Sequence, residues 1–245
     1  MLQNSFIQFS NRATELAIWK NNILHWDEFN PERISQIQGI NGTKIQQEIQ
    51  EWKIHIEDHK FVGTHLPSAE HWRLFKDFSH CCCFLDIETT GLSKYSNSIT
   101  TIAGFDGTQS RVFVQGQNMH EFQNYIKQFP MIITYNGKTF DFPFIKTHLN
   151  LQLDQIHIDL RYPLAKLGFK GGLKKIEQDL GINRDSTLKD INGYEAVRLW
   201  YRYKSGDVNA LELLKKYNVA DVENLQPLMN ITFEKLKEQE FLRHL

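Results

Sequence analysis

The sequence predicts an α/β fold in which helices flank a mixed β-sheet, preceded by a small and mainly helical region. From residue 80 onward, short apolar runs typical of strands alternate with segments whose apolar residues have helical spacing. Asp106-Gly107 supplies hairpin turn chemistry between two of these runs. Residues 1–79 instead carry helical patterns at 13–19 and 34–52 and no convincing strand. We therefore expect a helical region at 1–79 and an α/β domain at 80–245.

Each element of the α/β domain has its own signal. The run 82–87 is apolar, suits a buried strand and is followed by Thr-Thr-Gly as the strand's exit. Strands at 98–104 and 111–114 flank the Asp-Gly turn and form an antiparallel hairpin. The remaining predicted elements are a helix at 119–128, a strand at 131–135, a helix after Asp141, a strand at 156–159, and helices at 173–180, 194–203 and from 208 onward. This order predicts a mixed sheet with helices on its faces.

The composition limits the class of function. With 41% hydrophobic residues the chain can build a core, and its formal net charge of −1 argues against coating nucleic acid by bulk electrostatics. Any binding of nucleic acid must therefore depend on a local group of residues. No run approaches the about 20 apolar residues of a membrane span, and Met1–Ser10 lacks the regions of a signal peptide. We expect a cytoplasmic protein with no membrane partner.

Neither the cysteines nor the clustered histidines predict a metal site. Cys81, Cys82 and Cys83 are adjacent, and neighbours on a strand point to opposite faces, so they cannot share one tetrahedral ion. We expect reduced, buried cysteines that pack as small apolar groups. His55 and His59 are four apart on a predicted helix but lack the glutamate placement of a zinc-protease motif, so we interpret them as a solvated face.

Acidic residues gather in three short motifs. Asp86 and Glu88 are two apart at the end of the first strand, so they project to one face. Asp141 follows the fourth strand, and Tyr217 and Asp221 are four apart on one face of a predicted helix. Carboxylates that meet in a fold repel one another and are costly to desolvate, so such a cluster persists mainly where hard cations neutralise it. The pattern predicts a pair of Mg²⁺ or Mn²⁺ ions.

Each motif alone also has a structural interpretation. An Asp-x-Glu at a strand end is more often a solvated rim than a metal site. Asp141 alone could cap the helix at 142–149, and Tyr217 alone could be a core tyrosine whose hydroxyl reaches the surface. The motifs therefore favour a functional site only when they are taken together, in this order.

Together, FLDIETTGL, TYNGKTFDFPF and YNVADVENL resemble the motifs D-x-E, N-x₃₋₄-D and Y-x₃-D of the DEDD superfamily of 3′→5′ exonucleases. The third motif is of the tyrosine type, because Lys216 stands where the histidine type would have its histidine. The sequence is most similar to YprB-like exonuclease domains over about residues 80–228, including HIDL at 157–160, with a similar stretch, LPSAEHWRLFKDF, upstream. This resemblance implies a ribonuclease H-like fold.

The resemblance also implies a role for each matched residue. Asp86, Glu88, Asp141 and Asp221 are expected to bind two divalent ions that straddle the scissile phosphate. One ion would make a bound water acidic and the other would stabilise the departing 3′ oxygen. Tyr217 is expected to orient the attacking water, since a phenol of ordinary pKa, about 10, is a weak general base.

Further residues are candidates for substrate binding. Asn136 occupies the place of the family asparagine that reaches the terminal nucleotides; alternatively, Asn136-Gly137 makes the turn, and the two roles are compatible. Thr89 and Thr90 are placed to donate hydrogen bonds to the terminal nucleotide, and Gly91 lets the backbone approach closely.

One local basic cluster lies around Gly171-Gly172, and Lys174 is its candidate for substrate binding. Glycine before a helix leaves backbone N–H groups available for phosphate, although ordinary surface lysines at a helix start explain the cluster equally well. Its other members are Lys166, Lys170 and Lys175. Asp159, after the short strand, either orients a neighbouring group or caps the backbone.

The sequence therefore favours a metal-dependent 3′→5′ exonuclease acting on single-stranded or frayed 3′ ends of DNA or RNA. One alternative is a non-catalytic nucleic-acid-binding or assembly module on the same fold, against which the intact set of four acids and a tyrosine counts. A second alternative is a metal-dependent enzyme with another phosphoester substrate, such as free oligonucleotides. No segment supplies a dedicated reader of the 2′-hydroxyl, so DNA and RNA are not distinguished.

Overall fold

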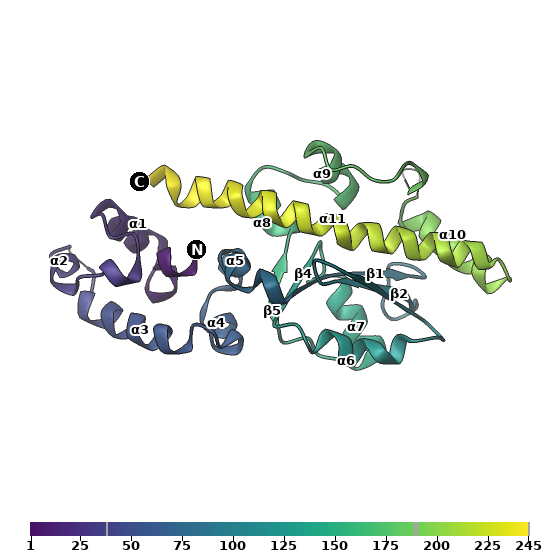
Figure 1. Ribbon diagram of the computed structural model, residues 1–245, viewed down its shortest axis with the longest axis horizontal. Helices are drawn as coiled ribbons and strands as arrows, with labels where there is room; N and C mark the ends of the chain where they lie inside the picture. The colour runs from purple at the N-terminus through teal and green to yellow at the C-terminus, as the bar shows by residue number, and fades with distance from the viewer. Residues whose placement is uncertain (38, 189–190, 245) are drawn as a thin grey trace. The chain divides into compact units, whose positions relative to one another are not determined.

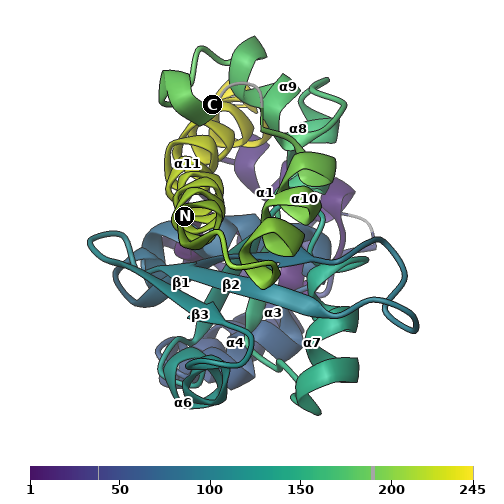
Figure 2. The ribbon, with the colours of Figure 1, turned by 90° about the vertical axis from the view of Figure 1, so that its right-hand side faces the viewer.

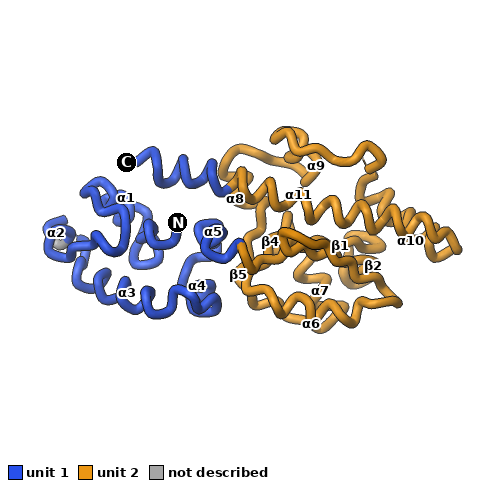
Figure 3. The backbone as a smooth tube through the Cα atoms, in the orientation of Figure 1, with its two compact units in different colours: residues 1–79, 233–245 blue, residues 80–232 orange. Residues whose placement is uncertain are grey.

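The computed structural model describes residues 1–37, 39–188 and 191–244 (Figure 1). Contacts divide the chain into two compact units, shown in Figure 3. Unit 1 comprises Met1–Ser79 and Phe233–Leu245, and unit 2 comprises His80–Thr232. One long helix, α11 (Val208–Glu240), contributes residues to both units.

Unit 1 is helical, and no strand occurs among its described residues. Its α-helices are α1 (Arg12–Lys20), α2 (Pro31–Ser35), α3 (Gly42–His55), α4 (His59–His65) and α5 (Phe75–Phe78), with 3-10 helices before α1, between α1 and α2, and between α4 and α5. At its centre the buried guanidinium of Arg73 pairs with Glu15 at 3.2 Å and with Glu70 at 2.6 Å. A buried charge requires such partners, so this ion pair network belongs to the core of unit 1.

The end of α11 packs within unit 1 through aromatic contacts. The ring of Phe233 lies 6.1 Å from that of Trp72 and 6.0 Å from that of Phe75, and Phe241 lies 5.0 Å from Trp19. Sequence reasoning assigned residues 80–245 to one domain, whereas these contacts place the last turns of α11 with the N-terminal helices.

The helical pattern over residues 34–52 corresponds to two helices in the structure. α2 ends at Ser35 and α3 begins at Gly42, where the side chain of Asn41 accepts a hydrogen bond from the Lys44 N–H. Gly39 between them has φ +82°, a left-handed conformation that glycine adopts without strain. The apolar spacing continues across the break, but the glycine turn and the asparagine cap end one helix and start another.

His55 and His59 lie on different helices, contrary to the prediction. α3 ends at His55, and α4 begins at His59 after the Asp58 side chain accepts hydrogen bonds from the N–H groups of Lys60 and Phe61. The aspartate cap separates the two imidazoles into two elements. Neither histidine belongs to a group of three or more potential ligand side chains within the described parts of the chain.

Unit 2 is built on a five-stranded mixed sheet with the strand order β3-β2-β1-β4-β5. Central β1 pairs antiparallel with β2 and parallel with β4, while β3 and β5 form the edges. The strands are β1 (Cys82–Thr89), β2 (Ile99–Phe105), β3 (Ser110–Val114), β4 (Met131–Thr134) and β5 (Ile156–Asp159). The prediction of a mixed sheet that begins with an antiparallel hairpin is confirmed.

Helices cover both faces of this sheet, with α6 and α7 on one face and α10 and α11 on the other (Figure 2). The helices of unit 2 other than α11 are α6 (Phe122–Ile126), α7 (Asp141–Leu149), α8 (Arg161–Lys166), α9 (Leu173–Asp179) and α10 (Gly193–Lys204). The helix expected at 119–128 is shorter, because a 3-10 turn, Met119–Glu121, precedes α6. None of the described helices combines the length and apolarity needed to cross a membrane.

Successive residues of β1 face opposite sides of the sheet, and the apolar and acidic side chains lie on different sides. Cys83, Leu85 and Ile87 are buried in the core cluster that α6 and α7 complete. Asp86 and Glu88 therefore project from the opposite face, on which α11 lies (Figure 2). Two of the three cysteines, at 82 and 83, are buried in β1 as expected, whereas Cys81 is half-buried in the 3-10 turn before the strand.

Candidate active site

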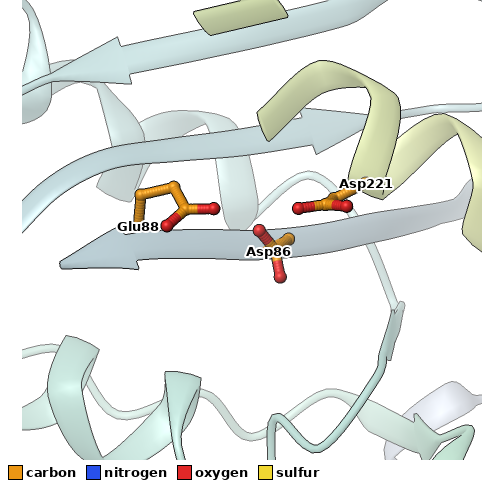
Figure 4. Close-up of side chains that lie close together, drawn as sticks. All are labelled: Asp86, Glu88 and Asp221. Carbon is orange, nitrogen blue, oxygen red and sulfur yellow. The ribbon is translucent and has the colours of Figure 1, made fainter. Parts of the chain in front are cut away.

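Three carboxylates from distant parts of the sequence meet above the sheet. Asp86 and Glu88 come from β1 and Asp221 comes from α11, and Figure 4 shows their carboxylates turned toward a shared space. One oxygen from each lies within 4.8 Å of the others. The strand period and the helix position thus combine to bring three acids to one point.

Asp141 lies outside that group of three but acts on it electrostatically. It is the first residue of α7, and Phe140 is the N-cap residue of that helix. It is 3% exposed, and its Oδ1 is buried without a hydrogen-bond partner in the described chain. Its charge contributes to the raised pKa values of Asp86 and Glu88. Asp141 is therefore not the N-cap residue of this helix, contrary to the structural interpretation.

The four carboxylates resist ionisation as a group. Burial raises the pKa of Asp141 to about 7 and that of Asp221 to about 6. Burial, followed by the charges of Asp221 and Asp141, raises the pKa values of Asp86 and Glu88 well above their ordinary range. Such a site needs either protons or cations, and an all-oxygen donor set with an unpartnered buried oxygen suits hard divalent ions. The residues present therefore fit Mg²⁺ or Mn²⁺.

Tyr217 and Lys174 border the acids in a cavity of about 340 Å³. Tyr217 is 6% exposed, and the Lys174 ammonium lies 5.0 Å from its ring centroid. Burial, reinforced by the charge of Asp221, raises the pKa of Tyr217 well above its ordinary value. The cavity is lined by Asp86, Glu88, Tyr135, Gly172, Leu173, Lys174, Asn192, Gly193, Tyr217 and Asp221.

Thr89, Thr90 and Gly91 do not line this cavity and make hydrogen bonds within their own loop. The Thr89 hydroxyl donates to the Gly91 carbonyl at 2.7 Å, and the Thr90 hydroxyl accepts from the Ser98 N–H at 3.0 Å. A Cβ at Gly91 would come within 2.5 Å of the Asn97 side chain. These residue types therefore shape the connection between β1 and β2.

Asn136 begins the turn between β4 and α7. Its φ is +68°, and its carbonyl accepts hydrogen bonds from the N–H groups of Thr139 and Phe140, both at 3.2 Å. Asp159 accepts from the Asn136 N–H at 2.7 Å and from the Lys138 N–H at 3.0 Å. Asn136 thus makes the turn, a role that is compatible with substrate binding, and Asp159 accepts hydrogen bonds from the backbone of that turn.

Asn218 links the acids to the sheet, and sequence reasoning missed it. Its Nδ2 donates to Asp86 Oδ2 at 2.7 Å, and its Oδ1 accepts from the Thr101 hydroxyl at 2.9 Å. The side chain is fully buried. A signal existed, because Asn218 stands three residues before Asp221 and therefore shares its helix face.

Arg184 was also missed, and it pairs with Asp221 in the buried interior. Both side chains are 6% exposed. Arg184 lies between α9 and α10, outside every motif, so no spacing in the sequence connects it with the acids.

Comparison with known proteins adds a family and a fold. The pattern of the RNase_H superfamily matches residues 83–233. The uncharacterized protein YprB of Bacillus subtilis is 28% identical over 166 residues, which are 58% of this chain and 39% of YprB. The chain thus spans well under half the length of this relative.

Comparison with solved structures gives matches of low sequence identity, of which the first is similar in fold. The family B DNA polymerase of the archaeon Pyrobaculum calidifontis matches with a TM-score of 0.51 at 16% identity, over 63% of this chain and 24% of the polymerase. NrnC of Brucella melitensis with bound Mg²⁺ matches with a TM-score of 0.49 at 17% identity, over 69% of this chain and 81% of NrnC. The superfamily pattern covers more than half of the 245 residues and most of unit 2. The chain therefore belongs to the RNase_H superfamily.

Proposed function

We propose that the chain is a divalent-metal-dependent 3′→5′ exonuclease of the tyrosine type in the DEDD superfamily, acting on single-stranded or frayed ends of DNA or RNA. The observation that carries the proposal is the meeting of Asp86, Glu88 and Asp221 within 4.8 Å, in a cavity that Tyr217 also lines. A cluster of this kind destabilises a fold unless cations neutralise it.

Asp86, Glu88, Asp141 and Asp221 are the proposed ligands of two Mg²⁺ or Mn²⁺ ions. Such ions lower the pKa of water and neutralise charge on a phosphate undergoing attack. The buried, unpartnered Oδ1 of Asp141 and the raised pKa values of all four acids support this assignment. Asn218 orients Asp86 through one of its oxygens and leaves the other available.

Tyr217 is the proposed positioning group for the attacking water. Because its pKa is raised, its hydroxyl stays protonated at neutral pH and acts as a hydrogen-bonding group rather than as a base. Lys174 extends over the tyrosine ring and offers a cation at the cavity wall to a substrate phosphate.

The loops beside the cavity are proposed to fit the terminal nucleotides. Thr89, Thr90 and Gly91 shape the loop after β1, and Asn136 shapes the loop before α7. Because the two threonine hydroxyls have partners inside the loop, we propose that they act mainly by holding the backbone in place.

A direct test incubates the full chain with 5′-labelled single-stranded DNA and RNA in Mg²⁺ and in Mn²⁺. A ladder of products shortened from the 3′ end, formed by the parent protein and not by Asp86→Asn, would support the proposal and also identify the sugar preference. Circular dichroism of both proteins provides the folding control. Metal binding and nucleic-acid binding without any hydrolysis would instead favour the non-catalytic module.

A further inference from the structure

The segment after α9 returns along that helix and brings Arg184 against Glu177. The Ile182 N–H donates to the Glu177 carbonyl at 2.8 Å, and the Gly181 N–H donates to the Gln178 carbonyl at 3.2 Å. Gly181 has φ +71°, the left-handed conformation that closes a helix in this way. The reversal allows Arg184 to reach back to a glutamate seven residues earlier.

Glu177 holds the guanidinium of Arg184 through both carboxylate oxygens. Nε donates to Oε2 at 2.5 Å and Nη2 donates to Oε1 at 2.7 Å. Asn224 on α11 donates a further hydrogen bond to Glu177 Oε1 at 3.0 Å. Glu177 is 2% exposed and Arg184 is 6% exposed, so the pair is removed from water. A buried, two-point contact of this kind fixes the plane of the guanidinium.

The fixed guanidinium contacts both members of the third motif. Nη2 of Arg184 forms an ion pair with Asp221 Oδ1, and the Arg184 Cζ lies 5.7 Å from the ring centroid of Tyr217. Glu177 partly offsets the charge of Arg184, and the guanidinium still neutralises part of the charge of Asp221. The two-point contact with Glu177 adds a fixed orientation of that guanidinium.

We propose that Arg184, held by Glu177, is a positioning residue for metal binding: it fixes one oxygen of Asp221 and leaves the other for a divalent ion. The same guanidinium supports the ring of Tyr217 beside that ion. This inference rests on the proposed function and assigns a task to two residues that none of the three motifs contains.

A competing account is that the guanidinium takes the place of a cation, so that a metal must displace it. The two accounts predict opposite effects of removing Arg184. As a positioning residue, its loss weakens metal binding, because Asp221 is then free to rotate. As a competitor, its loss strengthens metal binding, because one positive charge next to the ligand disappears.

The test uses the full chain and the variants Arg184→Lys, Arg184→Gln and Glu177→Gln, together with the double variant Glu177→Gln/Arg184→Gln. A single change can leave a buried charge unpaired and prevent folding. The double variant removes both charges, so it can still be compared with the parent protein in that case. Arg198→Gln is the matched control, because that arginine is 62% exposed on α10 and forms a surface ion pair with Glu195 of the same helix.

Mn²⁺ affinity is measured by calorimetry, and kcat and KM are measured on a labelled single-stranded oligonucleotide. In Arg184→Gln and in the double variant we expect Mn²⁺ affinity and kcat each to fall by about 10- to 100-fold, the range found when partners of metal ligands are removed. KM should change by less than about 3-fold. Arg184→Lys should recover part of the loss, and Glu177→Gln should lie between the parent and Arg184→Gln.

Tighter Mn²⁺ binding by folded Arg184→Gln would overturn the proposal in favour of competition, and parental values of affinity and kcat in the double variant would show that no positioning role exists. The proposed function fails separately, if the parent binds Mn²⁺ but hydrolyses neither DNA nor RNA. The calorimetric comparison then still decides whether Arg184 positions Asp221. A parent protein that binds no Mn²⁺ would overturn both proposals.

Discussion

Tyr217 and Asp221 lie one turn apart on α11, yet their environments give them different tasks. The Asp221 carboxylate forms an ion pair with Arg184, whereas the Tyr217 ring lies near both that guanidinium and the Lys174 ammonium. A carboxylate can bind a cation, while a phenol whose pKa is raised by burial can only hold a hydrogen bond. At the scale of residues, the proposed metal ligand and the proposed water-positioning group are therefore different side chains.

Tyr217→Phe tests this separation. The change removes one oxygen and spares the four carboxylates, so Mn²⁺ binding should be unchanged while the chemical step slows by about 10- to 1000-fold, the range for a single positioned group. Substrate affinity should hardly change. Calorimetric Mn²⁺ titration and single-turnover rates on the same preparation provide the measurement. Cleavage at the parental rate would remove Tyr217 from the site.

Asp86→Asn should abolish hydrolysis and leave the metal-free fold as stable as before or slightly more stable. The change removes a proposed ligand and relieves like-charge repulsion, and the new side chain can still accept the hydrogen bond from Asn218. Asp221→Asn should also be inactive but less stable, because the buried guanidinium of Arg184 loses one of its two ion pairs and keeps only that with Glu177. Thermal melts in EDTA compare the two variants. A large loss of stability in Asp86→Asn would show that this acid is structural.

At the scale of elements, the strands and the motifs can be predicted from the sequence because they depend on local residue patterns. Side chains alternate along β1, so Asp86 and Glu88 lie on the face opposite Leu85. This placement can be predicted from the alternation alone. Arg184 could not be found in the same way, because its contact with Asp221 depends on the reversal at Gly181 and on the packing of α9 beside α11. The break between α2 and α3 was missed because apolar spacing continued through it.

Asn218 joins three elements, since it bonds Thr101 of β2 and Asp86 of β1 from α11. Asn218→Ala should lower the free energy of unfolding by about 1–3 kcal/mol, because the buried Thr101 hydroxyl and the half-buried Asp86 carboxylate lose their partner. Asn209→Ala, an exposed position on the same helix, is the control. Urea unfolding monitored by circular dichroism measures the difference. Equal stabilities would mean that the link adds nothing to the packing of α11 on the sheet.

At the scale of the whole molecule, the acid cluster makes the metal-free protein sensitive to pH. Asp141, with a pKa of about 7, and Asp221, with a pKa of about 6, titrate well above the value of about 3.9 expected for an unfolded chain. Between these values the folded state binds more protons than the unfolded state. The stability contributed by protonation is therefore complete below about pH 4 and is lost as the pH rises toward 7.

In EDTA, the free energy of unfolding should thus fall between pH 5 and pH 8, and Asp141→Asn should reduce that fall by roughly 2 to 4 kcal/mol because the amide does not titrate. Mn²⁺ should restore stability at pH 8, since cations replace the missing protons. Urea titrations at the two pH values, with and without Mn²⁺, measure both effects. The same pH dependence in the parent and in the variant would exclude Asp141 as its source.

The division into two units predicts where the chain can be cut. All proposed ligands lie within residues 80–232, and the sheet and its core cluster are complete there. Phe233 and Leu236 are 2% and 0% exposed, and they belong to the segment of α11 that groups with residues 1–79. A fragment that ends at residue 232 avoids exposing these apolar side chains, whereas a fragment of residues 80–245 exposes them.

We therefore expect residues 80–232 to fold, bind Mn²⁺ and retain measurable hydrolysis, and residues 80–245 to show the same chemistry with a stronger tendency to associate. Circular dichroism reports folding, calorimetry reports Mn²⁺ binding, light scattering reports association and the labelled oligonucleotide reports hydrolysis. A longer fragment that stays monodisperse would show that the end of α11 does not depend on the N-terminal helices for cover. A folded 80–232 fragment that binds no Mn²⁺ would mean that the site needs unit 1, and the assignment of all ligands to unit 2 would be wrong.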